Sequence, residues 1–450
     1  MVGISNIGAE AQKVNSVKAE KDRIEKEAFF CTTKELSRLG LEQIPTQFQS
    51  HKHLIYSSPA TLAFNSPGAE GFGVKRAGLA VPDSIMLIVA PGCCGRNTSL
   101  ISSMKEYNDR FYYLMMDETD IVTGRHLKKI PKAVEEICSV CPKKPSVVMI
   151  CITCVDALLG TDMERVCKKA EEQVEIPVRP CYMYALTREG RKPPMVHVRQ
   201  SLYSLLEPGK KKGNVVNLLG FFSPLVDDCE IYDLLHSAGV KTIHEISRCK
   251  DYKEYQTMSE ANFNLVLHHE ARFAAEDFHN RLQIPFIELR RLYQIDKIEN
   301  QYHALGNALG VAFYDEKYKK QAEDALEKFR QKCPDASFAI GECLNADPFE
   351  LSLALIRYGF SVPEIYGTIT VENFTYIRSL AKISPETKVF SNMEPTMIYY
   401  DPAKSGVNLA IGKDACYYHP DCPYVMWNGE EQPYGYAGVR RLFEQLLEVV

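Results

Sequence analysis

The sequence predicts an α/β protein with three Rossmann-like domains, each built on a parallel sheet. Two observations lead to this fold class. Short, continuous apolar runs alternate with amphipathic stretches, as expected for parallel strands buried on both faces and connected by helices. The pattern begins anew after the polar, Gly-flanked break PGKKKG at 208–213 and again near residue 336. A chain of 450 residues has room for several such domains.

The first domain is expected over residues 1–207. A charged, solvent-facing helix is expected over residues 8–28, and a stretch rich in Ser, Pro and Gly that runs to about residue 84 is expected to be irregular. After it come four apolar runs that predict strands, namely IMLIVA (85–90), FYYLMM (111–116), SVVMICI (146–152) and VRPCYMYA (178–185).

The second domain is expected over 208–300 and the third, with a C-terminal helix, over 301–450. The second contains the predicted strands NVVNLLG (214–220), KTIHEI (241–246), FNLVLH (263–268) and PFIEL (285–289). Residues 291–332 predict two long helices. The last predicted strands are ASFAIG (336–341), SVPEIYG (361–367), KVFSN (388–392), VNLAIG (407–412) and YVMW (424–427).

Composition excludes several classes of function. The net charge of −5 is mild and gives no reason to expect a nucleic-acid partner. The N-terminal residues lack the apolar core of a signal peptide, and no run of about 18 apolar residues is long enough to span a membrane. We therefore expect no membrane association and a location in the cytoplasm.

The chain has 15 cysteines, which is unusual for a protein of a reducing compartment. Structural disulfides are rare there, so an excess of cysteine indicates metal or redox chemistry. Free cysteines also serve as small buried hydrophobic residues, and we expect this of most of them. Cys167, Cys229 and Cys333 are examples.

Two cysteines follow predicted strands directly. Cys94 lies in the turn APGCCGRNTS (90–99) after IMLIVA, beside Cys93, and Cys154 follows SVVMICI. In parallel α/β sheets, ligands bind at the carboxyl ends of strands, and thiolates are the usual ligands of iron–sulfur clusters. Cys94 and Cys154 are therefore candidate metal ligands. The alternative is a tight turn with inert thiols.

A zinc site is a rival interpretation. Cys138, Cys141, Cys151 and Cys154 have the spacing C-x2-C-x9-C-x2-C. However, Cys138 and Cys141 precede the predicted strand and Cys154 follows it. A seven-residue strand spans roughly 23 Å, so the two pairs would lie at opposite edges of the sheet.

Two further groups contain histidine. His268, His269 and Glu270 follow FNLVL, where they are candidate ligands or acid–base residues, or a hydrogen-bonded pocket wall. Cys416, His419 and Cys422 form C-x2-H-x2-C in a loop rich in Pro and Tyr. That loop offers only three local ligands, so a structural role is favoured there.

Neither a Rossmann G-x-G-x-x-G after a strand nor a G-x-x-x-x-G-K-[ST] loop is present. The sequence thus contains no recognisable dinucleotide or ATP site. If the protein transfers electrons, it needs metal centres and an external electron donor.

Over most of residues 60–450 the chain resembles the nitrogenase component 1 superfamily. APGCCGRNTS resembles the family's second cluster-cysteine turn, and CVDALLGTDME (154–164) resembles the turn with a further cluster cysteine. DETDIVTGRHLKKIPKAVEEI (117–137) resembles the family's E-x-D-x-V-F-G-G-x-x-K-L segment, with Thr123 and Arg125 in place of Phe and the second Gly. VVNLLGFFS (215–223) and NFNLVLHH (262–269) resemble the first and third strands of the family's second domain.

The sequence also departs from the family. The first cluster cysteine of the family would fall near Gly68, where this chain has no cysteine. At the position of the cysteine that holds the large nitrogenase cofactor this chain has His268. The segment PYGYAGVRR (433–441), matched to the family's C-terminal histidine ligand, contains no histidine. We therefore expect no molybdenum cofactor and no nitrogen fixation.

The resemblance implies an oxidoreductase subunit with an iron–sulfur cluster, of [4Fe–4S] type, bound by Cys94 and Cys154, with Cys93 as a possible additional ligand. It implies electrons from a separate ATP-dependent iron protein and a homodimer or a heterodimer with a paralogous subunit. A small-molecule substrate would bind among the three domains near His268, His269 and Glu270. A non-catalytic scaffold for metal-cluster assembly is the alternative, and a binding protein with incidental cysteines is the third.

Overall fold

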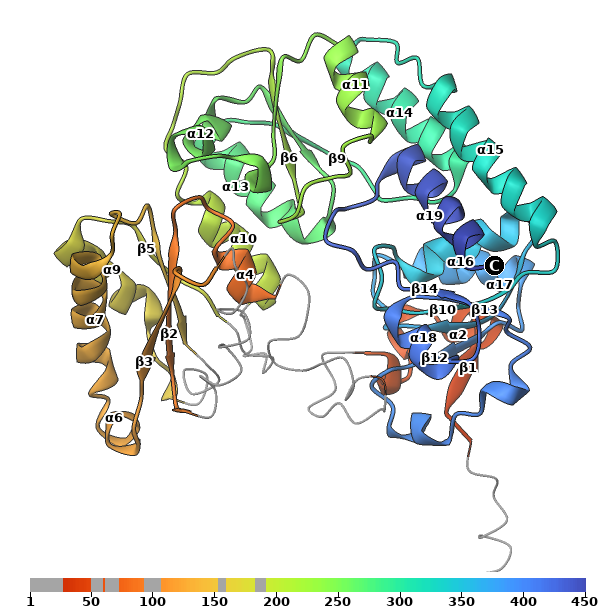
Figure 1. Ribbon diagram of the computed structural model, residues 1–450, viewed down its shortest axis with the longest axis horizontal. Coiled ribbons are helices and arrows are strands. Elements are labelled where there is room, and N and C mark those ends of the chain that lie inside the picture. Colours follow the sequence, from red (N-terminus) through yellow and green to blue (C-terminus); the bar gives the residue numbers. More distant parts are fainter. Residues whose placement is uncertain (1–26, 50–59, 61–72, 93–106, 153–158, 183–191) are drawn as a thin grey trace, which may run out of the picture.

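The computed structural model describes residues 27–49, 60, 73–92, 107–152, 159–182 and 192–450. These residues form three separate sheets, which succeed one another along an arc in Figure 1. Thirteen of the 14 described strands were predicted from apolar runs, and all but one of the neighbouring strand pairs are parallel. The predicted α/β class with several parallel sheets is therefore confirmed.

The first sheet has the strand order β3-β2-β4-β5. Its strands are β2 (Ile85–Ala90), β3 (Phe111–Met115), β4 (Val148–Ile152) and β5 (Val178–Pro180). One face packs against α7 (His126–Val140) and α9 (Met163–Val174), and the other against α4 (Val74–Gly78) and α10 (Pro194–Tyr203). A short helix, α6 (Glu118–Thr123), follows β3. Burial on both faces explains why β2 and β4 are apolar at every position.

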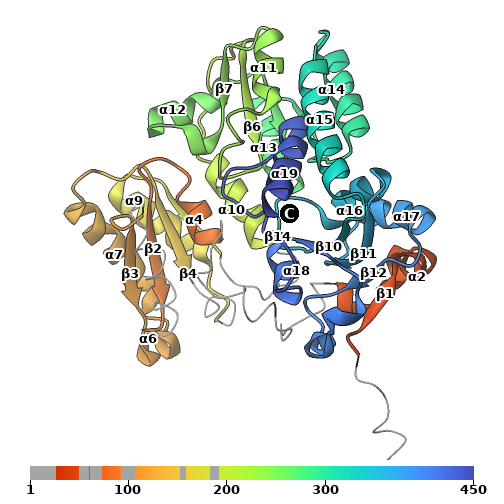
Figure 2. The ribbon, with the colours of Figure 1, turned by 45° about the vertical axis from the view of Figure 1, so that its right-hand side comes forward.

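The second sheet has the order β7-β6-β8-β9 and is also parallel. Its strands are β6 (Val215–Leu219), β7 (Thr242–His244), β8 (Phe263–Val266) and β9 (Phe286–Glu288). Its helices are α11 (Glu230–Ser237), α12 (Tyr252–Gln256) and α13 (Arg272–Leu282), with the 3-10 turns η4 (Ile246–Arg248), η5 (Thr257–Glu260) and η6 (His269–Ala271). Helix α10 contacts both α4 and α13, so it joins the first sheet to the second (Figures 1 and 2).

The third sheet has six strands in the order β1-β12-β11-β10-β13-β14. They are β1 (Phe30–Thr32), β10 (Ser337–Ile340), β11 (Ser361–Tyr366), β12 (Lys388–Phe390), β13 (Leu409–Ile411) and β14 (Tyr424–Val425). Its helices are α16 (Pro348–Arg357), α17 (Phe374–Ile383) and α18 (Lys413–Tyr418), and its 3-10 turns are η7 (Pro395–Tyr399) and η8 (Pro402–Lys404).

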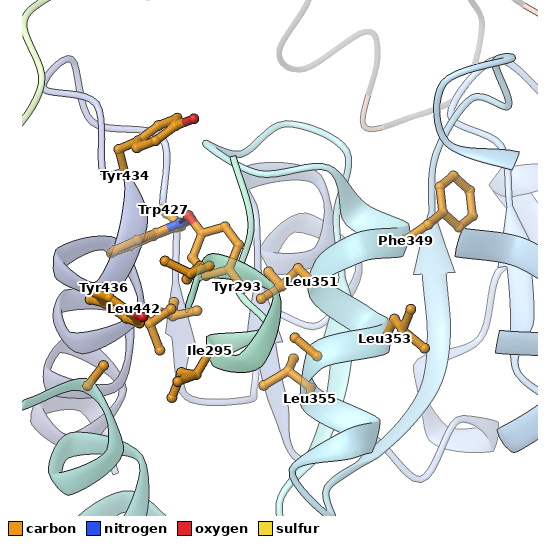
Figure 3. Packing of buried hydrophobic residues seen from close by; sticks show 14 of the residues in the cluster. Tyr293, Ile295, Phe349, Leu351, Leu353, Leu355, Trp427, Tyr434, Tyr436 and Leu442 are labelled. Atoms are coloured by element: carbon orange, nitrogen blue, oxygen red, sulfur yellow. Dashed lines mark hydrogen bonds between the residues drawn. The ribbon is translucent and has the colours of Figure 1, made fainter. Parts of the chain in front are cut away.

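Three long helices connect the second and third sheets. They are α14 (Ile295–Leu309), α15 (Glu316–Lys332) and the C-terminal α19 (Gly435–Val449). Their apolar residues belong to one continuous core that includes side chains of both sheets. Figure 3 shows part of it, where Tyr293 and Trp427 lie between α19 and α16. The second and third sheets therefore share a core.

The N-terminal segment differs from the prediction. We expected residues up to about 84 to be irregular and to belong to the first domain, but β1 pairs antiparallel with β12 of the third sheet, with Phe30 opposite Phe390. Helix α2 (Thr33–Leu39) follows, with a capping box between Thr32 and Glu35, and then η1 (Leu41–Gln43) and η2 (Thr46–Phe48). A three-residue strand is too short for its periodicity to be read from sequence.

Other parts of the prediction fall outside the described residues. The helix expected over 8–28 does so except for residues 27 and 28, which are not helical. The domain limits at residues 207 and 300 stay a prediction, apart from the reassigned N-terminal segment. Within the part of the chain that the structure describes, no helix has both the length and the apolarity needed to cross a bilayer.

Candidate functional site

The two candidate cluster cysteines follow neighbouring strands. β2 and β4 are paired in parallel, with Val89 opposite Ile152, so their carboxyl ends lie at the same edge of the first sheet. The segments that contain Cys94 and Cys154 therefore begin next to each other, at the ends of these two strands. Cys93, Cys94 and Cys154 themselves lie outside the described residues, so their role as ligands stays a prediction.

The cysteines of the rival zinc pattern are distributed differently. Cys138 lies at the end of α7 and Cys141 just after it, where the Cys141 thiol is 3.0 Å from the Tyr112 hydroxyl. Both precede β4, at the edge opposite to its carboxyl end. Cys151 is buried within β4, and Cys181, whose thiol donates to the carbonyl of Val74, is buried near it. These positions agree with the argument from strand length against a shared zinc site.

The C-x2-H-x2-C group belongs to a buried network. The His419 Nε2 atom lies 2.9 Å from the Tyr400 hydroxyl and 3.2 Å from a carboxylate oxygen of Glu364. Cys416 packs in the core behind the third sheet, and the Cys422 thiol donates to the carbonyl of Val407. Hydrogen bonds and packing thus account for these side chains, as the structural interpretation expected.

His268, His269 and Glu270 lie at the carboxyl end of β8 and line a cavity of about 420 Å³ between the second and third sheets. The loops after β8, β9 and β10 form its walls, with a contribution from α10. Its lining residues include Arg199, Phe221, Leu267, His268, His269, Glu270, Arg272, Glu288, Leu289, Arg290, Arg291, Glu342, Leu344, Asn345, Ala346, Asp347, Pro348, Glu372, Tyr376 and Gln432. A cavity of this size at strand ends is the usual form of a small-molecule site.

His268 is held closely by its neighbours. Gly220 follows β6 directly and has a φ of 137°. A Cβ at this position would lie only 2.7 Å from the backbone nitrogen of His268. The His268 ring stacks on His269 at 4.5 Å and meets the Phe221 ring edge-on at 5.7 Å. Its Nδ1 accepts a hydrogen bond of 3.4 Å from the backbone N–H of Glu270. In the neutral ring, this arrangement leaves the proton on Nε2.

The surroundings of His268 keep its imidazole neutral. Burial lowers the pKa of His268 well below its ordinary value, and unfavourable electrostatic interactions with Arg199, His269 and Arg291 lower it further. Neutral imidazole is the form that binds metals and donates a single hydrogen bond. The site therefore presents an uncharged nitrogen ligand or donor at neutral pH.

Arg199 fixes the position of Glu270. Its Nη1 donates to a Glu270 carboxylate oxygen at 2.7 Å, and its Nε and Nη2 donate to the carbonyl of Gly220 at 3.0 and 2.7 Å. Arg199 is 4% exposed, so solvent screens this ion pair only weakly. The pair holds the turn after β8 against the end of β6.

The opposite wall contributes two carboxyl groups from the loop after β10. Glu342 accepts hydrogen bonds from the backbone N–H and the hydroxyl of Thr368, and Asp347 accepts from the first N–H groups of α16. Burial raises the pKa of both Glu342 and Asp347. Both groups therefore hold protons to a higher pH than exposed carboxyl groups do.

Comparison with known proteins identifies the family. The family model described as nitrogenase component 1 type oxidoreductase matches residues 70–450. The chain belongs to this family.

Relatives of this nitrogenase component 1 chain include three proteins named nitrogenase iron-molybdenum cofactor biosynthesis protein NifE. The Sinorhizobium fredii protein is 25% identical over 418 residues, which cover 87% of this chain and 82% of the relative. The Nostoc protein is 25% identical and the Clostridium pasteurianum protein 24%. The matches cover 60% and 55% of this chain, but only 58% and 54% of those two relatives.

The fold of nitrogenase component 1 is also found by structure. A solved chain titled "Nitrogenase Cp1 at pH 6.5" superposes with a TM-score of 0.67 over 84% of this chain and 90% of that one. The sequence identity is 19%, so this likeness supports the fold alone.

In this nitrogenase component 1 chain, sequence reasoning found the His268 turn but missed the other cavity residues. Glu342 and Asp347 follow β10, and Arg290 and Arg291 follow β9, so the same strand-end rule indicates them. Arg199 lies inside α10, where sequence carries no comparable signal. Its role depends on how α10 packs between the first two sheets.

Proposed function

We propose that the chain is an iron–sulfur-dependent, cytoplasmic oxidoreductase subunit that reduces a small molecule bound in the cavity beside His268. The cavity itself is the main support, because it combines a neutral imidazole, a fixed Arg199–Glu270 pair and two proton-holding carboxyl groups at the ends of β8 and β10. These groups suit a reaction that takes up protons together with electrons.

A cluster at Cys94 and Cys154 is the proposed source of single electrons. The fit rests on donor chemistry, since thiolates bind iron, and on the paired ends of β2 and β4 that lead toward both cysteines. A [4Fe–4S] cluster is our proposal for its type. The chain itself would contribute the thiolates, and the described part of the chain shows that the strands before them are paired.

The residues of the cavity have distinct proposed roles. His268 donates a hydrogen bond from Nε2 or coordinates a metal of the bound molecule after a shift of tautomer. Arg199 and Glu270 act as positioning residues for His268, because Glu270 supplies the N–H that holds its Nδ1. Burial raises the pKa of both Glu342 and Asp347, which suits them as proton donors, and each two-electron reduction of a substrate to its dihydro form consumes two protons.

We further propose that the electrons come from a separate ATP-dependent iron protein. The sequence contains no phosphate-binding loop of the P-loop type, and donors of this kind serve the family that the chain resembles. Isolated chain should therefore neither hydrolyse ATP nor accept electrons from NADH.

A scaffold for assembly of a metal cluster is the second candidate. It is favoured by the relatives named cofactor biosynthesis proteins and by the neutral His268, which is suited to bind a cluster as cargo. An enzyme and a scaffold differ in turnover. An enzyme passes electrons repeatedly, whereas a scaffold accepts at most the equivalents that its bound cargo stores.

The test uses anaerobically purified chain, the iron protein from the same organism, ATP and dithionite. We expect ATP-dependent dithionite consumption of many electrons per chain, because protons serve as the default acceptor and yield hydrogen. His268→Ala should lower this flux at least tenfold. The matched control is His303→Ala. His303 is an exposed histidine of α14 and does not line the cavity.

Consumption that stops at a few electrons per cluster-loaded chain would reject the enzyme in favour of the scaffold. Equal loss of flux in His268→Ala and His303→Ala would remove His268 from the proposed site.

A further inference from the structure

Arg291 differs from the two ion-paired arginines of the cavity, Arg199 and Arg272, in its partners. Arg199 pairs with Glu270, and Arg272 forms two hydrogen bonds of 2.8 Å with Glu288. Arg291 has no ion pair with a carboxylate anywhere in the part of the chain that the structure describes. A positive charge within the cavity wall is therefore left without a matching negative one.

The guanidinium group of Arg291 is nevertheless held in place. It lies 4.4 Å from the centre of the Phe221 ring, and its Nη2 donates to the Gln432 side-chain oxygen at 2.6 Å. Gln432 is itself anchored by backbone hydrogen bonds to Pro224 and Val226. The Arg291 Nε is buried and has no hydrogen-bond partner among the described residues. Most of its five donor positions are thus unused.

Arg291 is partly buried, which lowers the pKa of its guanidinium group, and no carboxylate opposes this effect. Arginine stays protonated in proteins, so its charge persists in spite of burial. A buried charge without a partner is costly, and structures normally compensate it. Here the described residues supply no such compensation.

The other carboxyl groups of the cavity are already engaged. Glu342 is bound by Thr368, and Asp347 caps α16. Glu372 is exposed at the rim. With Glu270 and Glu288 paired to other arginines, the carboxyl groups of the cavity leave Arg291 uncompensated.

We propose that Arg291 binds a carboxylate group of the molecule that occupies the cavity. The exposed Arg290 also lines the cavity and has no ion pair among the described residues, so pairing geometry, and not the number of charges, favours a carboxylate. The guanidinium fork pairs with both oxygens of a carboxylate, and the Phe221 ring keeps the guanidinium plane in position. The ligand class is therefore an organic acid. The inference rests on the proposed function only in assigning the ligand to this cavity.

The experiment uses the full chain without iron protein or reductant, and the probes are benzoate and its neutral counterpart benzamide. Binding is followed by fluorescence of Trp427, the single tryptophan, whose Nε1 donates to the Tyr293 hydroxyl two residues from Arg291. We expect benzoate to bind and benzamide to bind at least tenfold more weakly. Arg291→Gln should remove this preference, and Arg291→Lys should keep part of it.

The matched control is Arg330→Gln on α15, which makes the same chemical change at an exposed site and should bind benzoate as the wild type does. Without ligand, Arg291→Gln should melt at the same or a higher temperature, because it removes an uncompensated charge. Arg291→Lys retains the charge and extends the test if the glutamine variant does not fold.

Unchanged benzoate preference in Arg291→Gln would overturn the proposal. Inorganic phosphate that binds more tightly than benzoate through Arg291 would overturn the carboxylate class. Because no electron transfer is measured, benzoate binding can succeed in a chain that fails the turnover test, and the two proposals can fail separately.

Discussion

At the scale of single residues, the position of His268 could be predicted from the sequence, but the ion pair beside it could not. Its place at the end of a strand follows from the apolar run before it, and the structure confirms that it lines a cavity. Arg199, which pairs with Glu270 of the same turn, lies 71 positions before Glu270 in the chain. Such a pair is set by helix packing, so local pattern did not reveal it.

The cluster cysteines give a direct prediction at this scale. Cys94→Ala and Cys154→Ala should each abolish the visible iron–sulfur absorbance of anaerobically purified chain, because each removes a thiolate ligand. Cys138→Ala is the control, since Cys138 lies in the last turn of α7, before β4 and so at the opposite edge of the sheet. Loss of absorbance in Cys138→Ala, with retention in Cys154→Ala, would show that the strand-end geometry was misread.

At the scale of elements, strands were predicted well because burial on both faces makes them continuously apolar. Helix α2 was missed although its capping box, Thr32 with Glu35, is readable in the sequence. The strand before it has only three residues and pairs with residues far along the chain. Its sheet could not be assigned from local sequence.

Helix α16 provides a prediction about pH. Glu350 is fully buried and accepts hydrogen bonds from the backbone N–H of Tyr293 and the side chain of Gln294. Burial raises the pKa of Glu350 from 4.5 to about 7. Between these values the folded chain holds a proton that the unfolded chain has released. Stability from this group is therefore full below pH 4.5 and is lost as the pH rises to 7.

The loss amounts to about 3 kcal/mol, at about 1.4 kcal/mol for each pH unit. Glu350→Gln does not titrate, so its urea midpoint should fall less between pH 5 and pH 8 than that of the wild type. Glu327→Gln, on the exposed face of α15, should follow the wild type. Parallel curves for wild type and Glu350→Gln would contradict a raised pKa at this position.

At the scale of the whole molecule, the repeated strand pattern was enough to predict three sheets, and the comparisons place the chain in the nitrogenase component 1 family. The pattern did not show how the sheets join. The second and third share one core, and the chain begins in the third sheet before it forms the first. Such joins depend on contacts between distant segments.

Assembly gives the third prediction. Each chain offers Cys94 and Cys154, whereas a [4Fe–4S] cluster takes four ligands. Two chains related by a two-fold axis supply four, and two-fold dimers are the commonest symmetric oligomers. Chain expressed alone without oxygen should have the mass of a dimer and about four irons per two chains. A monomer with a complete cluster would exclude a shared site. The same test applies if Cys93 binds the cluster in place of Cys94.

The same preparation should contain no molybdenum in stoichiometric amount, because the segment at 433–441 has no histidine. Elemental analysis of the purified chain measures molybdenum and iron in one sample. About one molybdenum per chain would contradict this prediction.

The antiparallel strand β1 has a consequence for biosynthesis. It leaves the ribosome before every other described strand, yet its partner β12 is made more than 350 residues later. All strands of the first two sheets are made before β12, so β1 has no partner strand until the third sheet forms. In the folded chain β1 covers the edge of β12, whose hydrogen-bonding groups would otherwise be open to pairing with another chain. A strand of three residues thus blocks association of folded chains through this edge of the third sheet.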